Sequence, residues 1–255
     1  MDDLFSLEGK YIIVTGGTRG IGKAITSRFA NAGATVLANY VRDVRSAEAL
    51  QDAIKKQGLS IQLCRADLAN SKGVEKLMNE IEKSEKEVSG FVHCAATGVH
   101  RPIHELTTRH FDWTFSLNVR AYFQLVKLLL PKFVEGASIV AISSTGAERA
   151  EPTYSLVGAS KGALESLSRH LAVELAPKQI RVNNLSAGAV LTDAWKALPD
   201  SENRLAERIR RSPNGRLTTP SEVAWAAQFL CSDASSGVNG HTLVVDGGER
   251  ISEGG

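Results

Sequence analysis

The 255-residue sequence predicts a single α/β domain: a doubly wound parallel sheet of seven strands with helices on both faces. Seven short apolar runs recur along the chain, and amphipathic helical patterns such as residues 21–32 and 74–83 separate them. Strands of a parallel sheet are buried on both faces and are therefore apolar throughout. No linker rich in proline, glycine or serine interrupts the alternation, so we expect one domain over residues 1–255.

The expected strands follow one another at regular intervals. They cover residues 11–15, 35–39, 60–64, 90–94, 138–142, 179–185 and 241–245. The rhythm breaks at residues 191–220, which are polar and rich in arginine. Long irregular segments inside a compact domain are commonly functional, so we expect a mobile lid over a substrate there.

Composition excludes several classes of protein. A formal net charge of +2 gives no reason to expect a nucleic-acid partner. The three cysteines lie far apart without metal-ligand spacing, so no metal is expected. No apolar run approaches the length of a membrane span, and the first residues lack a secretory pattern. We therefore expect a cytoplasmic protein without a membrane partner.

The first strand leads into a glycine-rich turn, with the sequence YIIVTGGTRGIG over residues 11–22. Gly16 permits the tight turn, Gly20 lets backbone amides approach a pyrophosphate, and Gly22 allows close helix packing. The N-terminus of the following helix then holds the negative charge. This pattern predicts the dinucleotide site of a Rossmann-type fold; the alternative is a tight turn without a ligand.

The end of the second strand favours NADPH over NADH. An NAD-preferring enzyme places a carboxylate there, but this chain has Tyr40 and Arg42. Arg19 and Arg42 suit the 2′-phosphate of NADPH, unless both are ordinary surface residues. Asp67, at the end of the third strand, either contacts the adenine amino group or caps a helix.

Several further motifs occur in a familiar order. They are Asn118 in LNV, Ser143 and Ser144 after a strand, Lys161 in ASK, Asn183 before SAG, and VDGG at residues 245–248. With the glycine turn, these motifs resemble the short-chain dehydrogenase/reductase superfamily over essentially the whole chain. The resemblance implies a nicotinamide-dependent oxidoreductase. It also implies cofactor contacts from Thr18, Ile21, Tyr40, Leu68, Ala95, Gly188, Val190 and Thr192.

One departure from the superfamily pattern is informative. Most members place the catalytic tyrosine four residues before the lysine, where this chain has Val157. The available tyrosine is Tyr154, seven residues before Lys161. This Tyr-x6-Lys spacing resembles the enoyl-acyl-carrier-protein reductases. Residues 146–161 are similar to the type I enzymes, whereas residues 93–98 and 110–118 are more similar to the NADPH-dependent type III enzymes.

The spacing fits conjugate reduction. In an enoyl thioester the hydride adds to C3 while charge develops on the thioester oxygen at C1, so a phenol farther from the lysine is suitably placed. We expect Pro152 to start a helix that holds Tyr154 in its first turn. By resemblance, Lys161 binds the nicotinamide ribose and keeps the local potential positive.

Two polar residues keep alternative roles. Ser144 is expected to contact the substrate, with Ser143 as its rival and capping of the strand end as the alternative. Asn118 either anchors a water chain to Lys161 or bonds the backbone of a kinked helix.

Two surfaces are candidates for partners. The helical patterns of residues 105–130 and 154–176 carry long apolar faces, and by resemblance they pair across subunits of a homotetramer or homodimer. A run of arginines either docks an acidic acyl carrier protein or forms a solvated helix face. Its members are Arg204, Arg208, Arg210, Arg211 and Arg216.

The leading hypothesis is an NADPH-dependent reductase of trans-2-enoyl thioesters, carried by acyl carrier protein or coenzyme A, in fatty-acid or polyketide synthesis. The alternative enzyme is a carbonyl reductase, such as a 3-oxoacyl-thioester reductase, with Tyr154 or Ser144 as the acid. A non-catalytic NADP(H)-binding module is a further alternative, because Val157 replaces the usual tyrosine.

Overall fold

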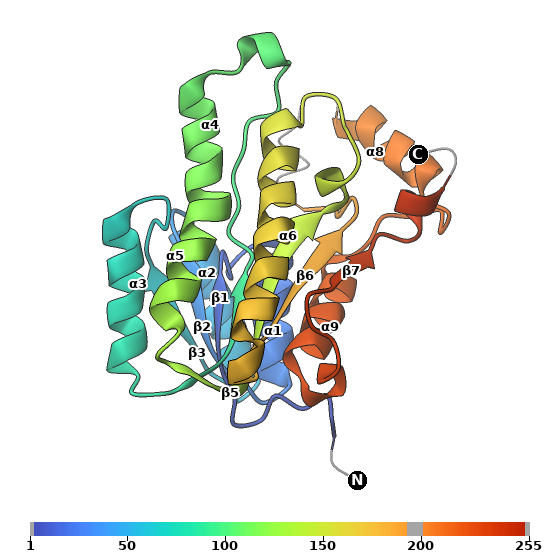
Figure 1. Ribbon diagram of the computed structural model, residues 1–255. Helices are drawn as coiled ribbons and strands as arrows, with labels where there is room; N and C mark the ends of the chain where they lie inside the picture. The colour runs from blue at the N-terminus through green and yellow to red at the C-terminus, as the bar shows by residue number, and fades with distance from the viewer. Residues whose placement is uncertain (1–2, 193–200, 253–255) are drawn as a thin grey trace.

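The computed structural model describes residues 3–192 and 201–252 and confirms the predicted fold class. Seven parallel strands form one sheet in the order β3-β2-β1-β4-β5-β6-β7 (Figure 1). The bounds are β1 (Tyr11–Thr15), β2 (Thr35–Tyr40), β3 (Ile61–Arg65), β4 (Val88–His93), β5 (Phe133–Ser144), β6 (Arg181–Ala187) and β7 (Thr242–Val245).

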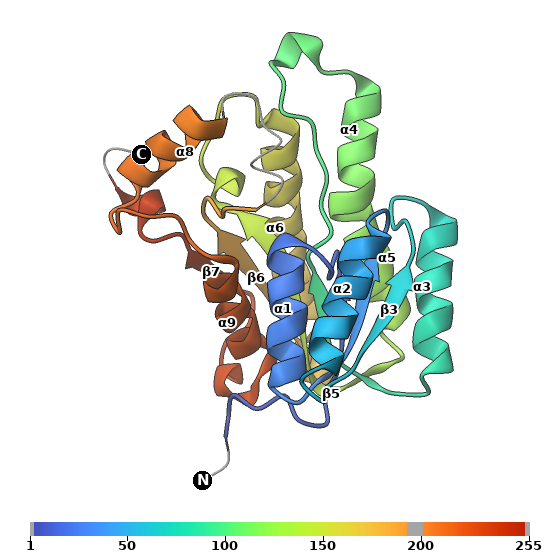
Figure 2. The ribbon, with the colours of Figure 1, turned by 180° about the vertical axis from the view of Figure 1, so that it is seen from behind.

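Helices cover both faces of the sheet. The helices α1 (Gly20–Asn31), α2 (Val44–Lys55) and α9 (Pro220–Cys231) pack on one face, as Figure 2 shows. On the other face lie α3 (Ser71–Lys83), α5 (Ala121–Leu129) and α6 (Ser155–Leu175). Each layer buries a continuous apolar core against the sheet, with Phe29 in one and Phe91 and Tyr122 in the other.

The strand order reverses between β1 and β4, which are paired in the middle of the sheet. Ligands of open α/β sheets bind at the carboxyl ends of the strands beside such a switch point. The glycine turn after β1, the turn after β4 and the end of β5 meet at this edge. The topology therefore places the predicted cofactor and catalytic residues together.

The helix expected over residues 105–130 extends from Thr108 to Leu129 and contains a π-helical segment. A short 3₁₀ helix (Ile103–Glu105) precedes α4 (Thr108–Phe115). The π-helical segment (Ser116–Arg120) lies between α4 and α5. Thr107 caps α4 by accepting a hydrogen bond from the His110 amide. The apolar periodicity continues through the π-helical segment, so the periodicity alone does not predict it.

The expected lid at residues 191–220 contains α8 (Ser201–Arg211), while residues 193–200 lie outside the described part of the chain. Most of the arginines proposed to dock a carrier protein are paired with carboxylates. Arg208 pairs with Glu151 and Glu249, Arg211 with Glu207, and Arg216 with Glu222. Arg210 is exposed, which fits the alternative of a solvated helix face. The Arg204 side chain lies outside the part of the chain that the structure describes.

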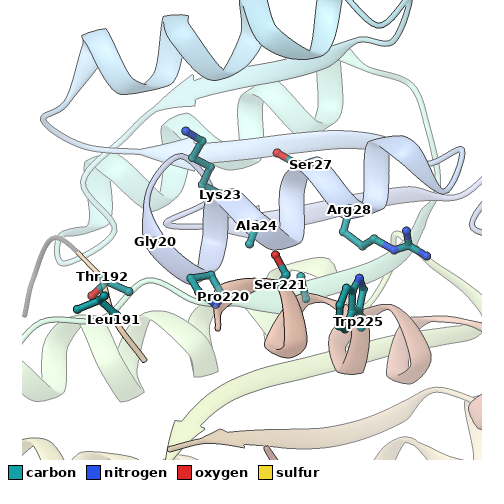
Figure 3. Close-up of a pocket in the computed structure, with 11 residues that line it drawn as sticks. Gly20, Lys23, Ala24, Ser27, Arg28, Leu191, Thr192, Pro220, Ser221 and Trp225 are labelled. Atoms are coloured by element: carbon teal, nitrogen blue, oxygen red, sulfur yellow. The ribbon is translucent and has the colours of Figure 1, made fainter. Parts of the chain in front are cut away.

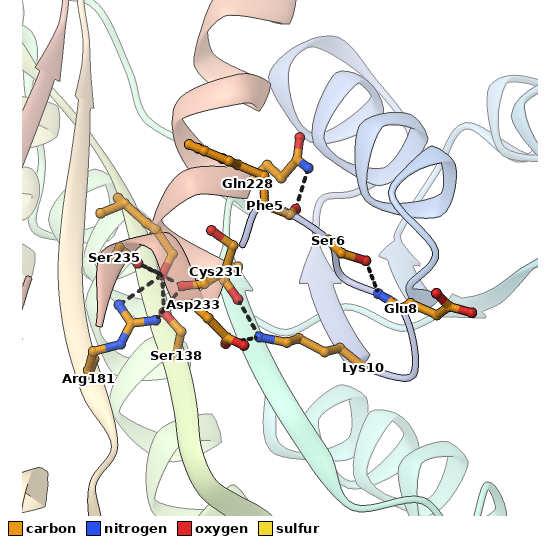
Figure 4. A network of polar contacts seen from close by, with 12 residues as sticks. Phe5, Ser6, Glu8, Lys10, Ser138, Arg181, Gln228, Cys231, Asp233 and Ser235 are labelled. Atoms are coloured by element: carbon orange, nitrogen blue, oxygen red, sulfur yellow. Dashed lines mark hydrogen bonds and ion pairs between the residues drawn. The ribbon is translucent and has the colours of Figure 1, made fainter. Parts of the chain in front are cut away.

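A polar network fastens α9 to the edge of the sheet (Figure 4). The Arg181 guanidinium donates to the carbonyls of Leu230 and Ser232, at 3.0 and 3.2 Å, where the helix ends. Lys10 forms an ion pair with Asp233 at 2.7 Å. The Arg181 guanidinium thus satisfies carbonyls that a helix C-terminus leaves without partners. In the described residues, no helix has both the length and the apolar character needed to cross a membrane.

Candidate active site

The glycine turn has the backbone geometry that the sequence predicts. Gly16 and Gly20 have φ values of +63° and +49°, a region that favours glycine. A Cβ on Gly22 would lie 2.1 Å from the Gly16 carbonyl oxygen, and one on Gly16 would lie 3.0 Å from Ala95 Cα. The Arg19 side chain does not cap α1, and the Gly22 amide bonds to Cys94, so the Gly20 and Ile21 amides are the ones that face an anion.

Half-buried Tyr40 ends β2 and exposed Arg42 follows it, while exposed Arg19 lies in the glycine turn before α1. Sequence reasoning missed Asp43, the nearest carboxylate. Its oxygens accept hydrogen bonds from the Ser46 amide at 2.9 Å and the Ser46 hydroxyl at 2.7 Å, so it caps α2. These bonds, with Arg19 nearby, lower the pKa of Asp43. This carboxylate is therefore engaged with the helix.

Asp67 and Leu68 lie at the end of β3. Asp67 is exposed and accepts a hydrogen bond from the Ala69 amide at 3.1 Å. Asn70 caps α3 instead, accepting from the Gly73 amide at 2.9 Å, so the helix-capping alternative for Asp67 is wrong. Leu68 is buried in the core, which leaves only its main chain to face a cofactor.

The base of the lid adjoins the glycine turn. A Cβ on Gly20 would lie 3.3 Å from the Thr192 methyl group. Gly188 packs against Asp246, and buried Val190 forms an isolated β-bridge with Thr218. Within the turn itself, Thr18 is buried and Ile21 is half-buried. The residues expected to contact the cofactor from the glycine turn and from the segment after β6 thus lie at the same edge of the sheet.

A groove of about 590 Å³ runs between α1 and α9 (Figure 3). Gly20 and Thr192 lie at one end, and Arg28 and Trp225 lie farther along it. Sequence reasoning did not identify this groove, because its walls come from helices that are distant in the sequence. Its lining includes neither Tyr154 nor any other predicted catalytic residue.

Tyr154 lies at the end of the loop that follows β5. Its hydroxyl donates to Ser144 Oγ at 3.4 Å, and its ring packs on Gly146, where a Cβ would lie 2.5 Å from Cε1. The His100 ring meets it edge-on, with centroids 5.2 Å apart. Burial raises the pKa of the Tyr154 phenol, and the hydrogen bond to Ser144 opposes this.

The expectation that Pro152 starts a helix containing Tyr154 is wrong. Helix α6 begins at Ser155, and Tyr154 is its N-cap residue. Thr153 has a φ of +63°, which interrupts helical geometry between Pro152 and Tyr154. The phenol is therefore positioned by its loop and by Gly146 as well as by the helix.

The two serines at the end of β5 face different partners. Ser143 is buried, and its hydroxyl donates to Glu165 Oε1 at 2.5 Å. Ser144 is half-buried and accepts from the Gly146 amide at 3.2 Å as well as from Tyr154. Ser144 therefore both caps the strand end and joins the phenol, whereas Ser143 is engaged elsewhere.

Lys161 is only 6% exposed, and its Nζ donates to the Ile142 carbonyl at 2.6 Å. Burial lowers the pKa of the Lys161 ammonium to about 8, with Cys94 and Glu165 opposing the shift. An ammonium group has three donors, so it can bind ribose hydroxyls in addition to Ile142.

Asn118 lies in the π-helical segment, and its side chain links that segment to the loop after β4 and to α6. Its Oδ1 accepts from the Thr97 amide at 2.8 Å, and its Nδ2 donates to the Thr97 carbonyl and to Ser160 Oγ, both at 2.9 Å. The side chain thus bonds the backbone of the loop after β4 and a residue of α6. The backbone that Asn118 bonds is that of the loop after β4, whereas the sequence suggested the backbone of its own kinked helix.

Val157 occupies the position where most superfamily members have tyrosine. Its side chain is 7% exposed, and a Cβ on Gly98 would lie 2.1 Å from Val157 Cγ2. The valine therefore packs directly on the backbone of the loop after β4. Sequence reasoning noted the missing tyrosine but not this contact with Gly98.

A glycine turn at the switch point, a buried lysine and a paired phenol and serine define a dinucleotide-dependent oxidoreductase. A family model described as "Enoyl-(Acyl carrier protein) reductase" matches residues 16–249. The chain belongs to the short-chain dehydrogenase/reductase superfamily, to which this model and the relatives below assign it.

Relatives with several different activities match nearly the whole chain. The 7α-hydroxysteroid dehydrogenase of Escherichia coli K12 is 34% identical over 250 residues, covering 96% of each protein. The 1-cyclohexenylcarbonyl-CoA reductase of Streptomyces collinus is 32% identical, covering 94% of this chain and 86% of that protein. The structure of a Burkholderia cenocepacia gluconate 5-dehydrogenase with NADP and tartrate is 28% identical, with a TM-score of 0.90 and 98% coverage of both chains.

Proposed function

We propose that this chain uses NADPH to reduce a carbon–carbon double bond conjugated to a thioester carbonyl. The observation that carries the proposal is the placement of the phenol. Tyr154 precedes α6 and reaches Ser144, while the position four residues before Lys161 holds an aliphatic side chain packed on Gly98. The site therefore has an acid displaced from the lysine.

NADPH, when bound, supplies the hydride. The open amides at the start of α1 would hold its pyrophosphate, and exposed Arg19 and Arg42 suit its 2′-phosphate. The NADP in structures of similar enzymes from Burkholderia cenocepacia supports this choice of cofactor. Lys161 would anchor the nicotinamide ribose from its buried position beside Ile142.

Tyr154 would act on the substrate oxygen. As hydride adds to C3, negative charge accumulates on the thioester oxygen, and the phenol hydroxyl stabilises it by a hydrogen bond. The hydroxyl of Ser144 orients the phenol and provides a second polar group near that oxygen. Burial raises the pKa of Tyr154, so the phenol keeps its proton at neutral pH.

Two comparisons support reduction of a conjugated double bond. The matching family model carries an enoyl reductase description. The name of the Streptomyces relative denotes a thioester whose ring double bond is adjacent to the carbonyl. We also propose that acyl carrier protein or coenzyme A carries the acyl group, and that the reaction belongs to fatty-acid or polyketide synthesis.

Carbonyl reduction is the second candidate, and the relatives favour it more directly. The names 7α-hydroxysteroid dehydrogenase and gluconate 5-dehydrogenase denote oxidation of a hydroxyl group, and a further relative is named 5-keto-D-gluconate 5-reductase. The paired hydroxyls of Tyr154 and Ser144 could likewise bind a ketone oxygen and protonate it.

The decisive experiment follows NADPH oxidation with crotonyl and acetoacetyl thioesters side by side and identifies the products. Enoyl reduction predicts turnover of the crotonyl thioester to the saturated acyl thioester. Turnover of the acetoacetyl thioester alone, giving the 3-hydroxyacyl product, would assign carbonyl reduction instead. Binding of NADPH without turnover of either thioester would favour the non-catalytic module.

A further inference from the structure

Three consecutive residues at the end of β5 are bonded to three side chains at or in α6. The Ile142 carbonyl accepts from Lys161, Ser143 donates to Glu165, and Ser144 accepts from Tyr154. Lys161 and Tyr154 belong to the proposed catalytic machinery. Glu165 occurs in the same set of contacts and has no role in the mechanism described above.

Glu165 is a buried carboxyl group beside a buried ammonium group. It follows Lys161 by four residues in α6, so the two side chains share one face of the helix, with Cβ atoms about 6 Å apart. Glu165 is 4% exposed and Lys161 is 6% exposed. Carboxylates are seldom buried without a partner, and two opposite charges attract strongly where water is excluded.

The other groups around Lys161 are neutral near pH 7. Burial lowers the pKa of His93 to about 3 and raises the pKa of the Cys94 thiol to about 11. Glu165 in turn has Glu148 near it from the loop after β5, Arg169 from α6 and Arg250 from the C-terminal turn. Of the two side chains that raise the pKa of Lys161, Cys94 and Glu165, only Glu165 is a carboxylic acid.

We propose that Glu165 is a positioning residue that keeps Lys161 protonated at and above neutral pH, with its carboxylate held in place by Ser143. This inference depends on the proposed role of Lys161 as the ribose anchor, but not on the identity of the substrate. The carboxylate acts through the lysine and does not itself touch the cofactor or the acyl group.

The sign of the pH effect follows from the two charges. Burial lowers the pKa of Lys161 to about 8, so the ammonium loses its proton above that pH. A negative neighbour favours the protonated lysine, so removing the carboxylate moves proton loss toward lower pH. Burial also raises the pKa of Glu165, and the hydrogen bond from Ser143 opposes this shift.

The test compares Glu165→Gln with Ser143→Ala. Glutamine removes the charge but keeps an oxygen that accepts from Ser143, whereas alanine removes that hydrogen bond and keeps the charge. The side-chain ¹⁵N signal of Lys161 is titrated by NMR in the protein without cofactor. We expect Glu165→Gln to lower the titration midpoint by about one pH unit and Ser143→Ala to lower it much less.

A second measurement follows NADPH binding by fluorescence from pH 6 to pH 9. In Glu165→Gln, binding should weaken roughly fivefold at pH 8 and roughly tenfold at pH 9, and it should approach that of the wild type at pH 6, because one pH unit is a tenfold change in proton affinity. Glu165→Asp, which keeps the charge, should restore most of the binding. If glutamine prevents folding, Glu165→Met replaces the charge with an apolar side chain of similar length.

An unchanged Lys161 titration in a folded Glu165→Gln protein would overturn the inference. Equal loss of NADPH binding at every pH would also overturn it, because it would indicate a purely structural role. Neither measurement uses a thioester. A failed crotonyl assay would therefore count against the proposed function but not against this inference.

Discussion

The hydroxyl of Tyr154 is the atom on which the proposed reaction depends most. Tyr154→Phe removes it while leaving the ring on Gly146, so turnover should fall by roughly two to three orders of magnitude with a smaller change in KM. Steady-state kinetics with the preferred thioester measures this. Tyr122→Phe is the control, because its hydroxyl bonds only to buried Ser168 among the described residues. Turnover within twofold of the wild type would remove Tyr154 from the mechanism.

Arg19, in the glycine turn, and Arg42, just after β2, should determine the choice of cofactor. Losing one charge-assisted phosphate contact costs about 1.5–3 kcal/mol. Arg42→Ala or Arg19→Ala should therefore raise the KM for NADPH by roughly tenfold or more and change the KM for NADH little. Lys23→Ala, in the groove on the outer side of α1, serves as the control. A wild type that prefers NADH would contradict this prediction.

The sequence predicted those site residues whose signal is a motif or a spacing. The glycine turn, Lys161 and Tyr154 stand out because each belongs to a short pattern along the chain. Glu165 and Gly98 do not, because their importance comes from contacts with Ser143 and Val157 that only the folded chain creates. Asp43 was overlooked because it lies beyond the strand end and its carboxylate is turned to α2.

At the level of elements, strand positions were predictable and helix interruptions were not. β1 begins and ends where the apolar run does, since all five of its residues are buried. The π-helical segment beside α4 and the left-handed Thr153 before α6 leave no such trace. Thr153 looks ordinary in the sequence. The motif around Asn118 suggested a kinked helix but not its bonding partners, because Thr97 and Ser160 belong to distant segments.

The ion pairs of Arg208 connect α8 to the loop that carries Tyr154. The guanidinium contacts Glu151 and lies 2.5 Å from the carboxylate of Glu249, while the Tyr154 amide donates to the Glu151 carbonyl at 3.3 Å. Arg208→Met leaves both carboxylates unpaired and should displace the loop. We expect kcat/KM to fall about tenfold to a hundredfold, since small displacements of catalytic groups are costly.

The control for Arg208→Met is Arg210→Met, an exposed residue of the same helix. Limited proteolysis within α8 should accelerate in the first variant and not in the second. If both variants keep wild-type kinetics, the ion pairs do not position Tyr154.

For the whole molecule, α4 and α5 expose large aromatic side chains on one face. Phe111 and Phe123 are 45% and 48% exposed, and Phe115, which stacks on Phe111, lines the same groove as Phe123. We predict that this face pairs with a second copy and gives a dimer or tetramer. Light scattering at micromolar concentration measures the mass, and Phe123→Glu should reduce it, whereas Lys56→Glu at the end of α2 should not. A monomeric wild type would refute the prediction.

The fold class was predictable at this scale because alternating strands and helices allow few chain topologies. The same rule places the ends of β1, β4 and β5 at one edge, so the general position of the site follows from strand order. The packing of α8 against Glu249 does not follow from it, because irregular polar segments lack the periodicity that locates helices and strands.

The contact between Gly98 and Val157 couples the substitutions that the two positions can accept. With a valine methyl group 2.1 Å from the place of a Cβ, a side chain at position 98 collides unless the residue at position 157 shifts or changes as well. A library that varies both positions together should therefore contain folded proteins that a library varying position 98 alone lacks.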